Sequence, residues 1–357
     1  MKAALFHEYG PPDVLKFQDW PDPVPRTGEV RIKVHAATVN RVLDVALRRG
    51  AQTQRAPVMP CIPGVDCAGL VDMIGPGVTR WKIGDRVAGA GTMPLNVVAE
   101  DGLAAYTGPK GMMGVKRPGG FAQYVCLPSA IVRPLPDNLS FHEAAVVMRH
   151  VPTAWNLLVN IAKLQKDEWV LIMGASGNLG AIGIQIAKNV IGANVICTAG
   201  SRARADLGLE LGADVAVDYS SEDLLAQIMK ATGGKGVDVL YDNIANPKVL
   251  PQAFKGIGMD GRLVTAGAHG GPDVMIDFFH LYDHRIMIKG SPGSREGDLP
   301  ACFAAAANGQ IKVQIAKVLP GAPTAKAAIP FKGPPPAKAA IASKASQEEP
   351  TTSEFEC

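Results

Sequence analysis

The stretch "VLIMGASGNLGAIGIQIAKNV" (170–190) decides the fold class of this 357-residue chain. An apolar run leads into a cluster of small residues, after which apolar side chains recur at helical spacing at Leu179, Ile182, Ile186 and Val190. This order predicts a strand, a tight turn and a helix. The alternative is a flexible loop between two core segments. The sequence on either side of the stretch distinguishes these two interpretations.

From about residue 140 onwards, apolar strands alternate with helical segments. Strands are expected at 168–173, 193–199, 214–219, 236–242, 261–268 and 285–290. Helices are expected at 179–190, 202–213, 221–234 and near 248–255. Strand–helix alternation at this spacing predicts βαβ units, and therefore a doubly wound parallel sheet in an α/β fold.

The first 128 residues instead consist of short apolar runs broken by Pro and Gly. Strands are expected at 29–39, 84–90 and 119–127, and such an irregular β-rich beginning predicts a barrel-like domain. Residues 90–119 form a long lobe without periodicity, and loops of that length are more often functional than idle. Residues 345–357 have the composition of a disordered tail.

Composition narrows the class of protein. A chain of 357 residues predicts two domains, and a formal net charge of +3 gives no argument for nucleic-acid or membrane partners. No apolar stretch is long enough to span a membrane, and the N-terminus is unlike a secretory signal. The six cysteines are scattered without C-x-x-C spacing, as expected of reduced thiols in a cytoplasmic protein.

Within the βαβ pattern, the small residues after the first strand acquire a physical reason. Ala175, Gly177 and Gly180 match a variant of the dinucleotide fingerprint G-x-G-x-x-G with Ala in first place. The first position makes a tight turn, Gly177 lets the backbone approach a diphosphate, and Gly180 lets the helix pack against the sheet. The diphosphate is expected on helix N-terminal amides. The candidate cofactor residues here are Ala175, Ser176, Gly177, Asn178, Leu179 and Gly180.

The end of the second strand indicates which dinucleotide binds. NAD sites usually carry an acid there, but this chain has Ala199 and Gly200, followed by Ser201, Arg202 and Arg204. A hydroxyl and guanidinium groups can receive a 2′-phosphate, which an acid would repel. The pattern therefore favours NADPH. The alternative is that the arginines are only a solvated helix start.

Several motifs in order resemble one known family. They are "PGVDCAGLVDMIGPGVTRWKIGDRVAG" (63–89), "GGFAQYV" (119–125), "AAVVMRHVPTAW" (144–155), "GASGNLG" (174–180), "LGADVAVDY" (211–219), "GVDVLYDNIA" (236–245) and "GRLVTAGA" (261–268). Together they resemble the medium-chain dehydrogenase/reductase superfamily, specifically its zinc-free quinone oxidoreductase branch. The resemblance covers roughly residues 1–318.

The resemblance implies a GroES-like β-barrel-type catalytic domain at 1–128 and a Rossmann NADP-binding domain at 129–290, with the active site between them. Residues 291–344 are expected to return to the catalytic domain in an atypical way, because the family's final helix and strand patterns are missing after 317–320. The usual closure of the catalytic domain is therefore expected to be lacking. Relatives commonly dimerise through the Rossmann sheet edge, so we also expect a homodimer.

The zinc ligands of the related alcohol dehydrogenases are not present at the corresponding positions. The family's Gly-His-Glu motif reads Gly64-Val65-Asp66, and the later Cys position reads Arg149. Valine cannot ligate zinc and a guanidinium would repel it, so no metal is expected. Without a Lewis acid, the expected reaction is hydride transfer from NADPH to a quinone or similar electron-poor carbonyl.

Two other functions stay open at this point. One is an enoyl- or acryloyl-CoA-type reductase, which would need a basic acyl-CoA channel to which the lobe with Lys110, Lys116 and Arg117 could contribute. The other is a protein that binds NADPH without catalysis. Low net charge and the lack of a basic aromatic stripe speak against RNA binding.

The resemblance also implies roles for single residues. Arg204 and Tyr219, with Ser201 beside them, would hold the 2′-phosphate, although Tyr219 could instead be a sheet-edge aromatic. Thr153 matches a Thr near the diphosphate. Asn243 and Gly267 lie at strand ends that approach the cofactor.

Three residues are candidates on the substrate side. Asn40 and Asp44 belong to a pattern that lines the pocket, but their spacing is one residue too long, and Asp44 could instead be a structural partner of Arg48. His150 could donate a proton to a reduced carbonyl, because imidazole titrates in the useful range. The alternative for His150 is a core histidine satisfied by backbone.

Overall fold

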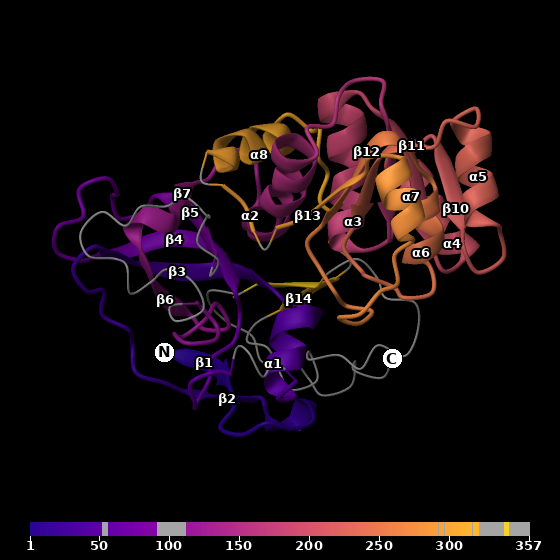
Figure 1. The fold of residues 1–357 in the computed structure, drawn as a ribbon. Coiled ribbons are helices and arrows are strands. Elements are labelled where there is room, and N and C mark those ends of the chain that lie inside the picture. The colour runs from indigo at the N-terminus through magenta and orange to yellow at the C-terminus, as the bar shows by residue number, and fades with distance from the viewer. Residues whose placement is uncertain are drawn as a thin grey trace.

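A computed structural model describes residues 1–51, 56–90, 112–291, 293–295, 297–315, 317–320 and 339–342. The described chain forms two large β-sheets, joined by helices that lie between them, and one separate two-stranded sheet (Figure 1). Most of the lobe at 90–119 and the whole tail at 345–357 lie outside the described residues, so the predictions made for them stay predictions.

The C-terminal sheet has six strands, and every neighbouring pair is parallel. The strands are β8 (Trp169–Met173), β9 (Asn194–Ala199), β10 (Val215–Asp218), β11 (Val237–Asp242), β12 (Ile257–Thr265) and β13 (Met287–Gly290). Their order is β10-β9-β8-β11-β12-β13, so the strand order reverses beside β8. The predicted doubly wound α/β sheet is confirmed. Five strands lie within the predicted segments, whereas β12 begins four residues before the predicted 261–268.

Helices cover this sheet. They are α3 (Asn178–Gln185), α4 (Arg202–Glu210), α5 (Leu224–Ala231), α6 (Leu250–Lys255), α7 (Phe278–Asp283) and α8 (Asp298–Ala307). Because α3 to α7 each return the chain to the same edge of this sheet, the carboxyl ends of β8, β9 and β11 lie side by side, whereas α8 packs against α2 (Phe141–Trp155). The π-helical turn Ile186–Ile191 continues α3, so the predicted helix at 179–190 is present as two joined pieces.

Helix α2 (Phe141–Trp155) connects the two sheets and was not predicted as a helix. It begins with a capping box, in which Ser140 Oγ accepts from Glu143 N and Glu143 Oε2 accepts from Ser140 N. Five successive residues, 144–148, are buried, because α2 contacts strands of the N-terminal sheet on one side and α3 and α8 on the other. Within this apolar run of five residues, no polar position marks the helical spacing.

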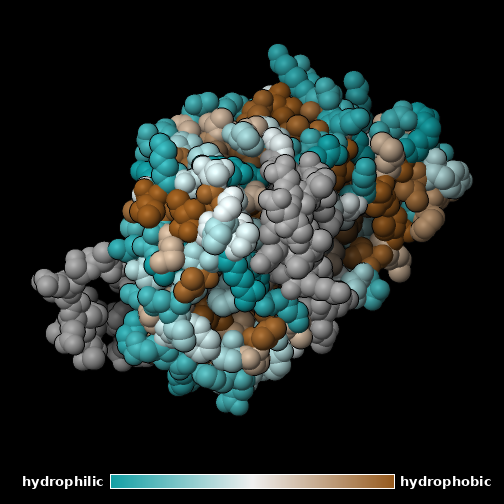
Figure 2. Space-filling model, turned by 90° about the vertical axis from the view of Figure 1, so that its left-hand side faces the viewer, coloured by the Kyte–Doolittle hydropathy of each residue, from teal (hydrophilic) through white to brown (hydrophobic). Residues whose placement is uncertain are grey.

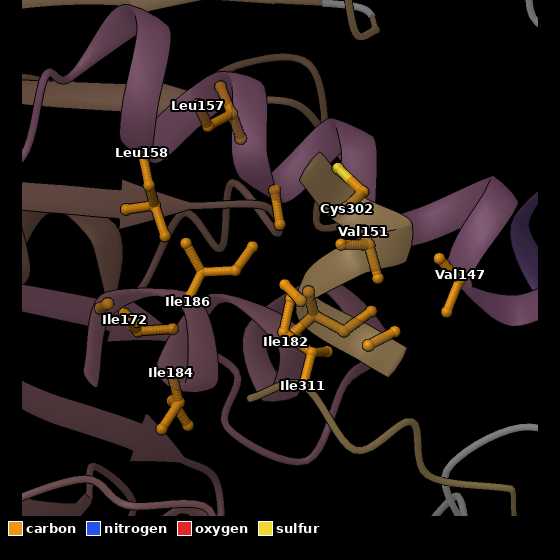
Figure 3. Packing of buried hydrophobic residues seen from close by; sticks show 14 of the residues in the cluster. Val147, Val151, Leu157, Leu158, Ile172, Ile182, Ile184, Ile186, Cys302 and Ile311 are labelled. Atoms are coloured by element: carbon orange, nitrogen blue, oxygen red, sulfur yellow. The ribbon is translucent and has the colours of Figure 1, made fainter. Parts of the chain in front are cut away.

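The core of the C-terminal part lies where α2, α3 and α8 meet. Val147 and Val151 of α2 point toward Ile182 of α3 and Cys302 of α8 (Figure 3). The π-helical turn Asn156–Ile161 continues α2. Packing of these apolar faces fixes α2 against the sheet that carries the dinucleotide fingerprint.

The N-terminal sheet is mainly antiparallel. Its strands are β3 (Glu29–Thr38), β4 (Asp66–Ile74), β5 (Arg86–Ala90), β6 (Tyr124–Pro128) and β7 (Val132–Pro134), and β1 (Lys2–Leu5) pairs separately with β2 (Lys16–Asp19). The strands expected at 29–39, 84–90 and 119–127 are present as β3, β5 and β6. A short helix, α1 (Ala46–Arg48), follows a π-helical turn at 41–45.

The chain returns to the N-terminal sheet near its C-terminus. Strand β14 (Lys317–Pro320) pairs in parallel with β15 (Ala339–Ala342), and β15 pairs antiparallel with β3. The expectation that a closing strand is lacking is therefore wrong. An Ala-rich segment carries no strong strand signal of its own, so only the open edge of β3 selects this pairing.

The face on the side of the N-terminal sheet is mostly hydrophilic, with smaller hydrophobic patches between (Figure 2). Among the described residues, no helix combines the length and the apolar character needed to cross a membrane.

Candidate functional site

The turn after β8 is built on Gly174. Its φ of +77° lies in the left-handed region that favours glycine, whereas Ala175 is fully buried and has no positive φ. Gly174 N and Ala175 N both donate to Thr198 O of β9, at 3.0 and 2.8 Å. The tight-turn role assigned to Ala175 therefore belongs to Gly174, which is the first Gly of "GASGNLG".

Gly180 and Gly177 have different reasons to be glycine. A Cβ at position 180 would overlap the backbone oxygen of Gly174, so the close approach of α3 to the turn requires Gly180. A Cβ at position 177 would lie 3.3 Å from the same oxygen, which is tight but not forbidden. Gly177 is the N-cap of α3, in extended conformation. Space for a diphosphate, rather than packing, is the remaining reason for Gly177.

The N-terminus of α3 offers amide donors. The first intrahelical bond runs from Ala181 N to Gly177 O at 2.8 Å, so the amides of Asn178, Leu179 and Gly180 have no intrahelical acceptor. Together with Ser176 in the turn, they form a concave run of backbone at the carboxyl edge of the sheet. A diphosphate fits such a donor set.

Two hydrogen bonds hold this turn in place. Asn243 Nδ2 donates to Met173 O at 3.0 Å, and Tyr241 Oη donates to Leu179 O at 3.1 Å. A Cβ at position 267 would lie 2.5 Å from Asn243 O, so Gly267 allows β11 and β12 to end close together. Asn243 and Gly267 thus lie beside the turn, and the Asn243 amide supports the turn itself.

Arg202 and Arg204 at the start of α4 have different surroundings. Arg202 forms ion pairs with Asp206 and with Glu222, and its Nη1 donates to Ala216 O at 3.0 Å. Arg204 Nε is buried and has no hydrogen-bond partner among the described residues. The positive charge of Arg202 is already compensated within the protein, so Arg204 is the arginine that can receive an anion.

Two residues with hydroxyl groups, Ser201 and Tyr219, lie at the end of β9. Ser201 is the N-cap of α4, but its side chain makes no capping bond. Tyr219 Oη lies against Gly200, 2.9 Å from where a Cβ would be, and Tyr219 N donates to Ala199 O at 3.1 Å. Neither hydroxyl has a hydrogen-bond partner in the described part of the chain. The structure thus places Ser201 and Tyr219 at the end of β9, with Arg204 in the first turn of α4.

Thr153 and His150 lie on α2. Thr153 is half-buried, and its hydroxyl has no partner among the described residues. His150 is buried, and its Nε2 has no partner in the same part of the chain, so the backbone bond expected for a core histidine is absent at that atom. The proton-donor role of His150 stays a prediction.

Asn40 immediately precedes the π-helical turn at 41–45, and Asp44 lies within it. A π-turn holds one more residue than an α-turn, which is how the chain accommodates the extra residue in the family spacing. Asp44 accepts from Asn40 N at 2.6 Å and from Gly64 N at 3.1 Å. Asn40 Oδ1 accepts from Leu43 N at 3.2 Å. Arg48 instead donates to Gly10 O, so Asp44 is not its hydrogen-bond partner.

The Asp44 carboxyl group is electrostatically unusual. Its pKa is raised to about 7, chiefly by burial and also by the nearby charge of Asp66, while the backbone bonds and the charge of Arg149 act in the opposite direction. Asp66 itself is fully buried, and it accepts from Thr38 N at 2.6 Å and from the Thr38 hydroxyl. Arg149 therefore lies within electrostatic reach of the Asp44 carboxyl group, a relation that sequence reasoning missed.

Val65 is buried between Gly64 and Asp66, where the zinc enzymes carry a histidine. In the residues that the structure describes, no group of three or more His, Cys, Asp or Glu side chains could hold a metal ion. The five described cysteines, Cys61, Cys67, Cys126, Cys197 and Cys302, form no disulfide.

Both the N-terminal and the C-terminal part of the chain match known protein families. Residues 26–137 match the alcohol dehydrogenase GroES-like domain, and residues 179–308 match the zinc-binding dehydrogenase family. The chain is 33% identical to quinone oxidoreductase of Rattus norvegicus over 275 residues, which cover 77% of this chain and 75% of the relative.

Two further proteins extend the likeness over most of the chain. An NAD-dependent alcohol dehydrogenase of Sulfolobus acidocaldarius is 30% identical over 328 residues, 89% of this chain and 92% of the relative. The crystal structure of an NAD-dependent alcohol dehydrogenase superposes with a TM-score of 0.84 at 31% identity, covering 96% of this chain and 99% of the other. The chain therefore belongs to the medium-chain dehydrogenase/reductase superfamily, in its quinone oxidoreductase-like branch.

Proposed function

We propose that the protein is a zinc-independent, NADPH-dependent oxidoreductase that transfers hydride to a quinone or a similar electron-poor carbonyl. The observation that carries the choice of NADPH is the set of unpartnered groups around the end of β9. Ser201 Oγ, Arg204 and Tyr219 Oη form a donor set for a 2′-phosphate, in a place without the acid that a ribose diol would need. Members of the family bind either NAD or NADP. The donor set after β9 favours the cofactor that carries the 2′-phosphate, NADPH.

The acceptor follows from the residue types on the substrate side. Val65 and Arg149 cannot ligate zinc, so an acceptor that needs no metal to be electrophilic is favoured. When bound, the reduced nicotinamide would supply a hydride, and the acceptor would take its two electrons together with a proton from solvent. The task of the protein is then to bind and orient the acceptor and to exclude water.

The CoA-thioester alternative receives less support. It relied on Lys110, Lys116 and Arg117 as a basic channel. Arg117 is paired with Glu29, which is almost fully buried, so its charge is engaged inside the N-terminal part. Lys110 lies outside the described residues.

Replacing Arg204 tests the cofactor choice. The Arg204→Glu variant should weaken NADPH binding by roughly 10- to 100-fold, because a charge-assisted hydrogen bond is lost, and should change NADH binding little. The matched control is Arg202→Glu, whose positive charge is already compensated by Asp206 and Glu222. Fluorescence titration of both coenzymes measures the dissociation constants. Equal losses of NADPH and NADH would refute the phosphate role of Arg204.

An acceptor screen tests the reaction. Purified protein should oxidise NADPH with 1,4-benzoquinone, and metal analysis should find much less than one zinc per chain. Turnover with unsaturated CoA thioesters alone would favour the alternative reductase. Tight NADPH binding without turnover across the panel would favour a protein without catalysis.

We also propose that the protein is a homodimer that pairs along β13. This strand ends the sheet, and all four of its residues are exposed, beside the exposed aromatic residues of α7. An apolar edge strand of this kind favours pairing with a second copy. Sedimentation velocity should show a dimer for the natural chain, a monomer for Met287→Lys, and a dimer for the control Ile83→Lys, whose side chain is similarly exposed in the turn before β5. A natural chain that sediments as a monomer would contradict the proposal.

A further inference from the structure

A carboxylate lies next to the proposed phosphate site, on the neighbouring strand. Strand β10 ends the parallel sheet on the side of α4 and α5 (Figure 1). Its last residue, Asp218, is in register with Ala199 of β9, and Tyr219 N donates to Ala199 O at 3.1 Å. Ala199 occupies the position where NAD sites usually carry an acid. The acid of this chain is therefore one strand further out, directly before the tyrosine of the proposed phosphate site.

The Asp218 side chain is bonded to the turn that follows it. Asp218 is buried, and its Oδ1 accepts from Ser220 N at 2.9 Å and from Ser220 Oγ at 2.6 Å. Its Oδ2 accepts from Ser221 Oγ at 3.0 Å. The hydrogen bonds from Ser220 lower the pKa of Asp218, so its carboxyl group is ionised at neutral pH. Both oxygens are engaged within the turn, which leaves little capacity to accept bonds from a ribose diol.

Further hydrogen bonds close the same turn. Ser221 N and Glu222 N donate to Asp218 O at 3.1 and 2.9 Å, and Glu222 Oε1 accepts from Asp218 N at 2.9 Å. Tyr219 is enclosed by these bonds, so they define the direction in which its side chain leaves the backbone. Hydrogen bonds to an ionised group are roughly twice as strong as neutral ones, so the two carboxylates supply the strongest bonds of the turn.

The Tyr219 ring depends on this turn for its place. The ring packs against the apolar cluster that includes Val217 and Leu224, and its hydroxyl has no partner in the described part of the chain. Tyr219 Oη lies 2.9 Å from where a Cβ of Gly200 would be, so the tip of the side chain reaches the end of β9. Apolar packing is not directional. The backbone of the turn therefore decides where the Tyr219 hydroxyl lies.

We propose that Asp218 is a positioning residue for NADPH: by bonding Ser220 and Ser221, it fixes the turn that holds the Tyr219 hydroxyl where the 2′-phosphate binds. The inference rests on the proposed choice of NADPH. The hydroxyl then donates to the phosphate without first having to be ordered, and such preorganisation raises affinity. NADH lacks the phosphate, so Asp218 contributes little to NADH binding.

The first test compares Asp218→Ala with Asp218→Asn in the full chain by fluorescence titration. Asp218→Ala should weaken NADPH binding roughly tenfold and NADH binding less than about twofold, because only the phosphate contact loses its ordered hydroxyl. Asp218→Asn should bind NADPH at least as tightly as the natural chain, because its amide oxygen still accepts from Ser220. An Asn variant that does not restore NADPH binding overturns the proposal, as does an Ala variant that binds NADPH as tightly as the natural chain.

A double-mutant cycle shows whether Asp218 acts through Tyr219. Tyr219→Phe removes the hydroxyl and should itself weaken NADPH binding roughly tenfold. In that background, Asp218→Ala should change NADPH binding by less than about twofold, because no hydroxyl is left to position. If the two losses instead multiply to about 100-fold, the residues act independently and the proposal is wrong.

The matched control is Asp223→Ala, which removes another aspartate of the same segment. Asp223 caps α5, where its Oδ1 accepts from Ala226 N at 3.0 Å. This variant should lose thermal stability, because a helix cap is removed, and should keep both coenzyme dissociation constants. If it weakens NADPH binding as much as Asp218→Ala does, the effect of Asp218 is general destabilisation and the proposal is overturned.

A second variant covers the case in which Asp218→Ala does not fold. Ser220→Ala/Ser221→Ala removes two of the donors to the Asp218 carboxylate at exposed positions. It should weaken NADPH binding about threefold in the natural chain and leave it unchanged in the Tyr219→Phe background. Natural NADPH affinity in the double variant contradicts the proposal.

Failure of this inference and failure of the proposed function give different results. A natural chain that binds NADPH no more tightly than NADH refutes the proposed choice of cofactor, and the role of Asp218 with it. A natural chain that prefers NADPH, together with independent losses in the double-mutant cycle, refutes the role of Asp218 alone.

Discussion

The two sheets assemble their polar groups in opposite ways. In the parallel sheet, the turn at Gly174 and the amides of α3 come from one strand–helix connection, and the donors around Gly200 come from the connections after the neighbouring strands β9 and β10. In the antiparallel sheet, the buried polar contacts join distant segments, such as Thr38 with Asp66 and Asp44 with Gly64. The first arrangement is encoded locally, so it can be read from a motif. The second exists only when the whole sheet is formed, and it places a carboxyl group with a strongly raised pKa beside an arginine.

A substitution that breaks the local arrangement should have the largest effect. In Gly180→Ala, the new Cβ would overlap the Gly174 oxygen, so the turn and α3 must separate. We expect a loss of about 3 kcal/mol in the free energy of unfolding and the loss of measurable NADPH binding. Urea unfolding and NADPH fluorescence measure the two effects.

The matched variant Gly177→Ala separates packing from binding. Its Cβ would meet the same oxygen at 3.3 Å, so the free energy of unfolding should change by less than about 1 kcal/mol. NADPH binding should still weaken, because the diphosphate approaches this backbone. Equal destabilisation by the two alanines would show that the turn is not the rigid element described here.

The contacts between distant segments of the antiparallel sheet should make the free energy of unfolding depend on pH through Asp44. The pKa of Asp44 is about 7 in the folded chain and 3.8 as its ordinary value, so between these pH values the folded state holds a proton that the unfolded state has released. The stability from this proton is fully present below about pH 4, and it is lost as the pH rises through about 7. The slope is at most about 1.4 kcal/mol per pH unit.

Comparison with Asp44→Asn isolates this contribution from other titrating groups. Urea unfolding at pH 5, 6, 7 and 8 should show a more negative slope of stability against pH for the natural chain than for the variant. The difference should vanish above about pH 8. Parallel slopes at all four pH values would mean that Asp44 is ionised throughout, as an exposed carboxyl group would be.

The smallest effect on NADPH binding is expected for the bond that ties β11 to α3. Tyr241→Phe removes the hydroxyl that donates to Leu179 O, inside a fully buried environment. The expected change is about 1 kcal/mol in the free energy of unfolding, with NADPH affinity changed less than in Gly177→Ala. A loss of NADPH binding as large as in Gly180→Ala would show that the local motif depends on distant support after all.

Much of the parallel sheet was predictable because each strand and helix shows its own period and the turn residues stand at fixed offsets. Helix α2 was not predictable in this way, because residues 144–148 are all buried and no polar position among them marks the helical spacing. The turn residue was placed one position too late, at Ala175. A motif fixes which residues are small, whereas the positive φ that distinguishes Gly174 belongs to the folded backbone.

The sequence by itself determined the α/β class, the superfamily resemblance and the absence of an acid after the second strand, because these depend on residue type and local spacing. Only the tertiary structure decided that Arg202 is compensated while Arg204 is available, that Arg149 acts on Asp44, and that residues 339–342 pair with β3. Charge compensation and strand pairing are relations between segments far apart in the chain. Their outcome depends on distance and burial, which no single stretch of sequence contains.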